Sequence, residues 1–179
     1  MISHILVAID QSTVNHRAFE TALGMAKDLG AELTLVHALD VFDRASPQQP
    51  RVLVNGYSMD LDRLLRESYE RQWAEFVDHY ESLLKQKQEE ARAIDVPANY
   101  RQPYGRPGAA ICQAAKEVHA DLIIAGSHGR KGLSEMILGS VSNYIMHHAP
   151  CSVMVIHPDN QRNHTPLRAS SERNTAEMS

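Results

Sequence analysis

The sequence predicts an α/β fold built on a doubly wound parallel sheet of five strands. Short apolar runs alternate with helical patterns over nearly the whole chain of 179 residues. The run ILVAI at residues 5–9 is unbroken and rich in branched side chains, which is typical of a strand covered on both faces. The first strand, helix and second strand follow one another closely, which favours a parallel pair joined by a right-handed crossover.

The opening unit is strand, helix, strand. The apolar run predicts a strand over His4–Asp10. Ser12 or Thr13 can cap the amphipathic helix that follows, and this helix is expected to stop before Gly30. The segment ELTLVHAL at Glu32–Leu39 predicts the second strand.

A long connection and a long helix come next. Residues 41–59 hold two prolines and a glycine among polar side chains, so they are expected to form a loop. Apolar residues then recur three and four apart, which predicts one helix from Asp60 to about Arg92. Its aromatic residues are expected in the core rather than in a base-stacking platform, and they are Tyr69, Trp73, Phe76 and Tyr80.

The rest of the chain predicts three more strands and two helices. They are a weakly patterned strand at 96–104, a helix at Pro107–His119, a strand at Asp121–Gly126, a helix at Ser140–His148 and a strand at Ser152–His157. One domain over residues 1–157 is therefore expected. Residues 158–179 are almost entirely polar and are expected to form a disordered C-terminal tail.

Composition narrows the class of protein. The chain carries 18 basic and 22 acidic residues, a formal net charge of -4, which disfavours nucleic acid as a partner. Its apolar stretches are too short to span a membrane, and the N-terminus does not resemble a leader peptide, so a soluble cytoplasmic protein is expected. Cys112 and Cys151 lie far apart with no CxxC motif, and both are expected to be small core residues.

The most informative segment begins where the fourth strand ends. Gly126, Gly129 and Gly139 follow the spacing G-x2-G-x9-G, and Ser140 and Ser142 come at the predicted start of a helix. Ligands of open α/β sheets bind outside the carboxyl ends of the strands, and this loop leaves such an end. Glycines allow a close backbone approach, while helix-start amides and hydroxyls donate to phosphate oxygens. The segment predicts an anion-binding loop, with glycines that serve only as turns as the alternative.

Other features of this region leave alternatives open. Neither GxxxxGK[ST] nor GxGxxG after the first strand is present, which excludes a Walker-type NTPase and a nicotinamide Rossmann domain. His128 lies inside the loop and is a candidate phosphate neighbour or proton carrier. Arg130 and Lys131 either neutralise phosphate charge or form a solvated face. His37, in the second strand, is expected to be a hydrogen-bonded core or rim residue.

The glycine pattern, within GSHGRKGLSEMILGSVSNYIMHHAPCSVMVI, resembles the signature of the universal stress protein family. The opening ILVAIDQS and the phrases LTLVHALD and ADLIIAGSHG add to the resemblance, which covers residues 2–157. It implies an adenine-nucleotide alpha-hydrolase-like fold with strand order 3-2-1-4-5. It also implies a homodimer formed through the fifth strand, and a member of the ATP-binding branch that takes ATP, or another adenine nucleotide, with Mg²⁺.

The resemblance also implies a binding site, residue by residue. Asp10 matches an acid that contacts the nucleoside, Ala38 matches a backbone position that reads adenine, and Ala8 stands where relatives often carry proline. The implied nucleotide-binding residues are Ala8, Ile9, Asp10, Ala38, Ala125, Gly126, His128, Gly129, Gly139, Ser140, Val141 and Ser142. The tail and the loop at 41–59 depart from the family pattern, and this loop is a candidate lid over the nucleotide.

The function expected from these residues is a stress-response or signalling module. ATP binds, the nucleotide state controls contacts with an unidentified protein partner, and hydrolysis is at most slow. Phosphoryl transfer needs a group that orients the nucleophile, and no residue identifies itself as one, so none is assigned as catalytic. A slow ATPase or adenylate-handling enzyme and a nucleotide-free dimeric scaffold are the two alternatives, and metal ligands are unknown.

Overall fold

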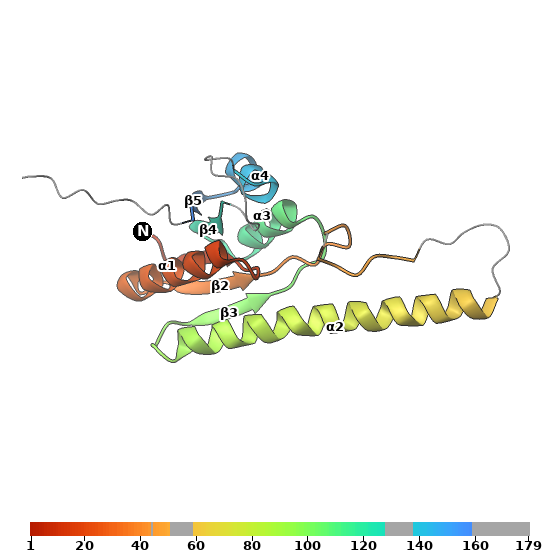
Figure 1. The fold of residues 1–179 in the computed structure, drawn as a ribbon. Helices are drawn as coiled ribbons and strands as arrows, with labels where there is room; N and C mark the ends of the chain where they lie inside the picture. The colour runs from red at the N-terminus through yellow and green to blue at the C-terminus, as the bar shows by residue number, and fades with distance from the viewer. Residues whose placement is uncertain (44, 51–58, 128–137, 159–179) are drawn as a thin grey trace, which may run out of the picture.

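The computed structural model describes residues 1–43, 45–50, 59–127 and 138–158 (Figure 1). A five-stranded parallel sheet has the order β3-β2-β1-β4-β5, which confirms the expected fold. Its strands are β1 (His4–Ala8), β2 (Glu32–Val36), β3 (Ala98–Arg101), β4 (Leu122–Gly126) and β5 (Ser152–Ile156). The weakly patterned third strand is thus confirmed, as a short edge strand. Each strand lies within the range expected from the sequence, and β1, β2, β3 and β5 end one to three residues before the end of that range.

Helices cover both faces of the sheet. They are α1 (Thr13–Leu29), α2 (Met59–Arg92), α3 (Pro107–Glu117) and α4 (Ser140–His148). Alternate residues of β1 enter two separate cores, because successive strand side chains point to opposite faces. Ile5 and Val7 pack with α1 and α2, whereas Leu6 and Ala8 pack with α3 and α4. The near-continuous apolar strands therefore have the two covered faces that their sequence predicts.

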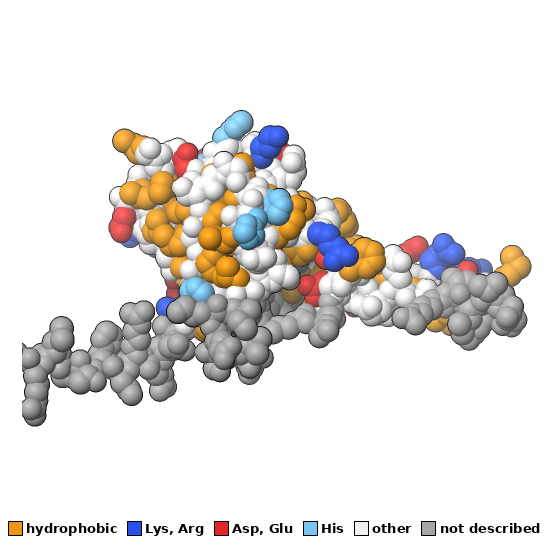
Figure 2. Space-filling model, turned by 90° about the horizontal axis from the view of Figure 1, so that it is seen from above, with side chains coloured by type: hydrophobic (Ala, Val, Ile, Leu, Met, Phe, Trp, Pro, Cys, Tyr) orange, Lys and Arg blue, Asp and Glu red, His pale blue; other side chains and the backbone are white. Residues whose placement is uncertain are grey.

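The long helix α2 is only partly in the core. Its 34 residues correspond to about 51 Å, and Figure 1 shows its first half extending beyond the sheet. The buried side chains Tyr80, Leu84 and Ala91 all belong to the second half. In Figure 2 the first half projects at the right, away from the main body.

The expectation that all four aromatic residues of this helix are core is therefore wrong for three of them. Only Tyr80 is buried, while Tyr69, Trp73 and Phe76 are half-buried. These three rings form a row along the helix, with centroids 6.3 Å and 5.5 Å apart. The helical periodicity of the apolar residues continues past the end of the sheet, so periodicity alone overstated the extent of burial.

Other expectations concern single residues and segments. Cys112 is buried and Cys151 is half-buried against the same core, and burial raises the pKa of both thiols. Within the described part of the chain, no helix combines the length and the apolar content needed to cross a bilayer. His128, Gly129, Arg130, Lys131, most of the tail and residues 51–58 lie outside the described residues.

Candidate functional site

The sheet brings the described residues of the expected site to one edge. Ala8 ends β1, Gly126 ends β4, and Ala38 comes two residues after β2. β1 lies between β2 and β4 in a parallel sheet, so the carboxyl ends of these three strands are neighbours. The amide of Ile9 continues the ladder beyond β1 by donating to the carbonyl oxygen of Val36 at 2.8 Å.

The turn from β1 into α1 is held by its own side chains. Oδ1 of Asp10 accepts a hydrogen bond from the amide of Ser12 at 2.6 Å. Oγ of Ser12 in turn accepts from the amide of Asn15 at 3.2 Å, which caps the helix. One first-turn amide of α1 is therefore paired with a side chain, and Asp10, half-buried, keeps one carboxylate oxygen outside its bond to Ser12.

The junction of β4 and α4 is fixed by backbone bonds. The amide of Gly139 donates to the carbonyl oxygen of Ser127 at 2.7 Å, and the amide of Ser127 donates to Ile156 in β5 at 2.8 Å. Oγ of Ser142 lies 3.1 Å from the carbonyl oxygens of both Ser127 and Gly139, so its hydrogen is used within the junction. The first turn of α4 is thus held directly beyond the end of β4.

The start of α4 differs from that of α1. The residue that precedes α4 is Gly139, which has no side chain to accept from the first-turn amides, and no side-chain cap is formed there among the described residues. Ser140 is exposed and Val141 half-buried at this turn. Uncapped helix-start amides carry partial positive charge and bind anions. The start of α4 therefore suits a phosphate group better than that of α1, where Ser12 already pairs the amide of Asn15.

Gly126 joins the two halves of this edge. A Cβ atom at this position would lie 3.1 Å from Cγ1 of Val14 and 3.7 Å from the amide nitrogen of Asn15, in the first turn of α1. A Cβ atom there would require the side chain of Val14 to shift by a few tenths of an ångström. The strand's last residue therefore allows the start of α1 to approach the β4–α4 junction closely.

Three buried polar side-chain atoms have no hydrogen-bond partner among the described residues, and all lie at this edge. They are Oδ1 of Asn15, Nε2 of His37 and Oγ of Ser127. Each residue follows a different central strand, β1, β2 and β4 respectively. Buried polar groups are almost always hydrogen-bonded, so a concentration of unpaired ones indicates a place where a ligand or water supplies the partners.

His37 is held firmly at the end of β2. Its Nδ1 lies 3.0 Å from the carbonyl oxygen of Ile9, and its ring stacks on Tyr80 with centroids 3.6 Å apart and planes 6° from parallel. Burial lowers the pKa of His37, against smaller opposing effects that include the hydrogen bond to Ile9 and the charge of Asp10. The expectation of a hydrogen-bonded core or rim histidine is confirmed.

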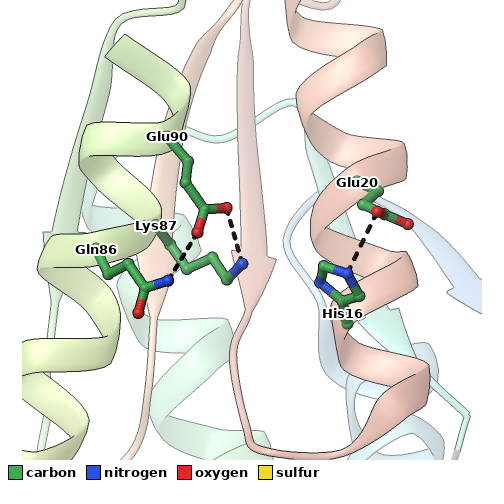
Figure 3. Close-up of polar contacts among 5 residues, drawn as sticks. All are labelled: His16, Glu20, Gln86, Lys87 and Glu90. Carbon is green, nitrogen blue, oxygen red and sulfur yellow. Dashed lines mark hydrogen bonds and ion pairs between the residues drawn. The ribbon is translucent and has the colours of Figure 1, made fainter. Parts of the chain in front are cut away.

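A cavity of about 260 Å³ opens beside Ile9 and Asp10, between α1 and α2. Its remaining lining residues are Gln11, Ser12, Asn15, His16, Phe19, Leu83 and Lys87. Nζ of Lys87 lies 2.8 Å from Glu90 and 4.6 Å from the centre of the Phe19 ring, and its side chain is only 12% exposed. Figure 3 shows Lys87 and Glu90 on α2, with the exposed pair His16 and Glu20 on α1.

The other described site residues do not line this cavity. Ala8, Ala38, Ala125 and the start of α4 lie outside its lining. A second cavity, of about 460 Å³, lies between α3 and α4 and contains none of the expected site residues. No cluster of three or more metal-ligating side chains occurs in the described ranges.

Several residues of this edge were not anticipated from the sequence. Asn15 and Ser127 have unpaired buried atoms, and Lys87 reaches the cavity from a helix far along the chain. Asn15 and Ser127 each stand within a few residues of an expected site residue, and that proximity was the available signal. Nothing in the charged pattern of α2 distinguishes Lys87 from its solvated neighbours.

Solved structures with the same fold include complexes with nucleotides. A universal stress protein in complex with cAMP is 21% identical, with a TM-score of 0.57 and coverage of 87% of this chain and 97% of that chain. An Archaeoglobus fulgidus protein with dAMP is 21% identical (TM-score 0.53; 87% and 99% covered). An Arabidopsis thaliana protein with AMP is 23% identical (TM-score 0.55; 93% and 97% covered). At these identities the likeness shows the fold.

Sequence comparisons give the family. A universal stress protein of Synechocystis sp. is 30% identical over 152 residues, which cover 85% of this chain and 96% of that protein. The structure of a universal stress protein from Lactobacillus plantarum is 26% identical, with a TM-score of 0.65 and coverage of 87% and 97%. The model of the universal stress protein family matches residues 1–157. This chain therefore belongs to the universal stress protein family.

Proposed function

We propose that this protein binds ATP at the carboxyl edge of β1, β2 and β4, as a stress-response or signalling module of its family. The observation that carries the proposal is the set of three unpaired buried polar atoms, one after each of these strands. The uncapped start of α4 at the same edge supports it, because that turn can receive a phosphate group.

The residues at this edge fall into distinct roles. The amides of Ser140, Val141 and Ser142 bind phosphate oxygens, Asp10 accepts from the nucleoside, and the backbone at Ala38 reads the adenine. Ala8, Ile9, Ala125 and Gly126 form the floor, while Gly139 and the residues beyond Gly126 complete the phosphate loop. Mg²⁺ arrives with the nucleotide and neutralises phosphate charge, and no described residue is assigned to it.

Binding, with hydrolysis at most slow, is the proposed activity. Relatives in complex with AMP, dAMP and cAMP support an adenine nucleotide as the class of ligand. The described residues at the start of α4 offer amides that hold phosphate, and Ser142 already spends its hydroxyl hydrogen on the backbone. Occupancy then controls contacts with a protein partner, with residues 1–157 as the nucleotide-binding domain and residues 158–179 as a separate tail.

The test is direct identification of the ligand. Freshly purified protein is denatured, and the released nucleotide is identified and counted by mass spectrometry. Gly139→Val adds a branched side chain at the uncapped helix start and is expected to abolish nucleotide retention. Gly24→Ala is the matched control, because a Cβ there meets no atom within 4 Å.

Each outcome decides between the alternatives. ATP or ADP near one molecule per chain, lost in Gly139→Val and kept in Gly24→Ala, supports the proposal. If nothing is released, ATP with Mg²⁺ is added and the melting temperature is measured, because a ligand of the native state raises it. No release and no shift would favour the nucleotide-free scaffold, whereas turnover well above background would favour the enzyme.

A further inference from the structure

We propose that Nε2 of His37 accepts a hydrogen bond from the 6-amino group of the bound base, which makes His37 a residue that selects adenine. This inference rests on the proposed function and adds a side chain to it. The resemblance to the family assigns the reading of adenine to the backbone at Ala38 and gives no role to His37.

The contacts of His37 define which of its nitrogens carries the proton. Nδ1 lies 3.0 Å from the carbonyl oxygen of Ile9, and a carbonyl oxygen can only accept. Nδ1 therefore donates. Burial lowers the pKa of His37 below its ordinary value, which favours the neutral ring above pH 7, and in that form Nε2 carries a lone pair and is a hydrogen-bond acceptor. The parallel stack on Tyr80 fixes the plane of the ring and hence the direction of that lone pair.

This acceptor has no donor among the described residues. Nε2 is one of the unpaired buried atoms of the edge, and the residue is 9% exposed. Leaving a buried acceptor unpaired costs about 1–3 kcal/mol. The charged or titratable groups that act on the ring are Asp10, Asp43 and His79, and none of them supplies this hydrogen bond.

The position of His37 indicates which donor it meets. It directly precedes Ala38 and bonds to Ile9, so it stands between two expected nucleotide-binding positions on neighbouring strands. The 6-amino group is the hydrogen-bond donor of adenine, whereas hypoxanthine carries an acceptor oxygen there. Nε2 is shielded in the described conformation, so the base reaches it once a neighbouring side chain moves. Phe76, half-buried on α2, is one such neighbour, with its ring centroid 6.2 Å from that of His37.

Two substitutions separate recognition from structure. His37→Asn places an amide where Nδ1 stood, so it keeps a donor for Ile9 and loses the distal acceptor. His37→Gln places an amide oxygen near the position of Nε2, so it keeps an acceptor and loses the bond to Ile9.

Affinities for ATP and ITP are measured for the wild type and both variants. His37→Asn is expected to bind ATP about threefold to tenfold more weakly than the wild type does. It is also expected to lose the preference for ATP over ITP. His37→Gln is expected to retain that preference.

A spectroscopic readout reports on the same atom. In protein labelled with ¹⁵N-histidine, the Nε2 resonance of His37 is expected to move upfield on addition of ATP and to stay in place with ITP. An unchanged resonance with bound ATP, or equal ATP preference in His37→Asn and wild type, overturns the inference. A loss of preference in His37→Gln alone also overturns it, because the role would then lie in the bond to Ile9. If the wild type binds neither nucleotide, the proposed function itself fails.

Discussion

In the β1–α1 turn, Asp10 accepts a hydrogen bond from the amide of Ser12 at 2.6 Å, and Ser12 accepts one from the amide of Asn15 at 3.2 Å. At the same edge, Asn15, His37 and Ser127 each keep one buried polar atom unpaired. Unpaired buried groups reduce stability, so these three atoms destabilise the free protein, whereas the hydrogen bonds of Asp10 and Ser12 stabilise it. A ligand that pairs them recovers this cost on binding.

His37 gives the first prediction, which concerns pH. Burial lowers its pKa, so below the ordinary histidine pKa of about 6.5 the unfolded chain takes up a proton that the folded chain resists. The free energy of unfolding is therefore expected to fall as the pH drops from 7.5 to 5.5. Denaturant unfolding of wild type and His37→Gln at several pH values measures this, and His37→Gln should lose less stability over that interval.

The other histidines are present in both proteins, so the difference between the two slopes isolates His37. Equal slopes would show that His37 is protonated as easily in the folded chain as in the unfolded one, in disagreement with its burial.

At the scale of the elements, α3 and α4 approach each other closely at Gly108. A Cβ atom at Gly108 would lie 2.7–2.8 Å from Cδ1, Cβ and Cγ of Tyr144. Gly108→Ala is therefore expected to destabilise the protein by about 1–3 kcal/mol through overpacking. The measurement is thermal or urea unfolding.

Gly24 provides the matched control for that prediction. It lies inside α1, where an added Cβ meets no atom within 4 Å. Gly24→Ala is expected to stabilise by about 0.5–1 kcal/mol through helix propensity. If Gly108→Ala were as stabilising as Gly24→Ala, the close packing of α3 on α4 would be wrong.

The two halves of α2 are expected to differ in protection from hydrogen exchange. Residues 59–76 contribute no buried side chain, whereas Tyr80, Leu84 and Ala91 anchor the rest. A helical segment of this length with little tertiary support is marginal in water. Amides of the first half are expected to exchange much faster than those of the second, as read by mass spectrometry of peptic fragments. Equal protection would mean that another surface covers the first half in solution.

Elements were predictable from sequence to the extent that a local pattern carried them. The apolar run in β1 and the three-and-four spacing in α2 reflect burial and periodicity directly, so both were anticipated. The length of the sheet that α2 crosses is a tertiary property, and for that reason the half-burial of Trp73 was missed. Likewise, the unpaired state of Asn15 and Ser127 depends on contacts between distant segments, such as the approach of Gly126 to Val14.

For the whole molecule, the two sheet edges are unlike. β3 ends one side with the short polar strand ANYR, and β5 ends the other with SVMVI, of which residues 153–156 are half-buried. An exposed apolar edge favours pairing with another chain. We therefore propose that the homodimer implied by the family resemblance forms through β5, and Val155→Lys is expected to give monomers by light scattering after gel filtration.

The opposite edge supplies the control. Asn99→Lys introduces the same charge on β3, where no pairing is proposed, and should leave the mass unchanged. Dimers that persist in Val155→Lys but dissociate in Asn99→Lys would move the interface to β3.

The unequal helix starts at the carboxyl edge also have a consequence for the polarity of any ligand. α1 begins behind Ser12, whose Oγ accepts from the amide of Asn15, whereas α4 begins behind a glycine that has no side chain to accept from its amides. An elongated ligand with an anionic head is therefore attracted more strongly at the start of α4 than at the start of α1. We expect it to bind in one direction across the strands, with its head at the start of α4 beyond β4 and its uncharged body toward β2.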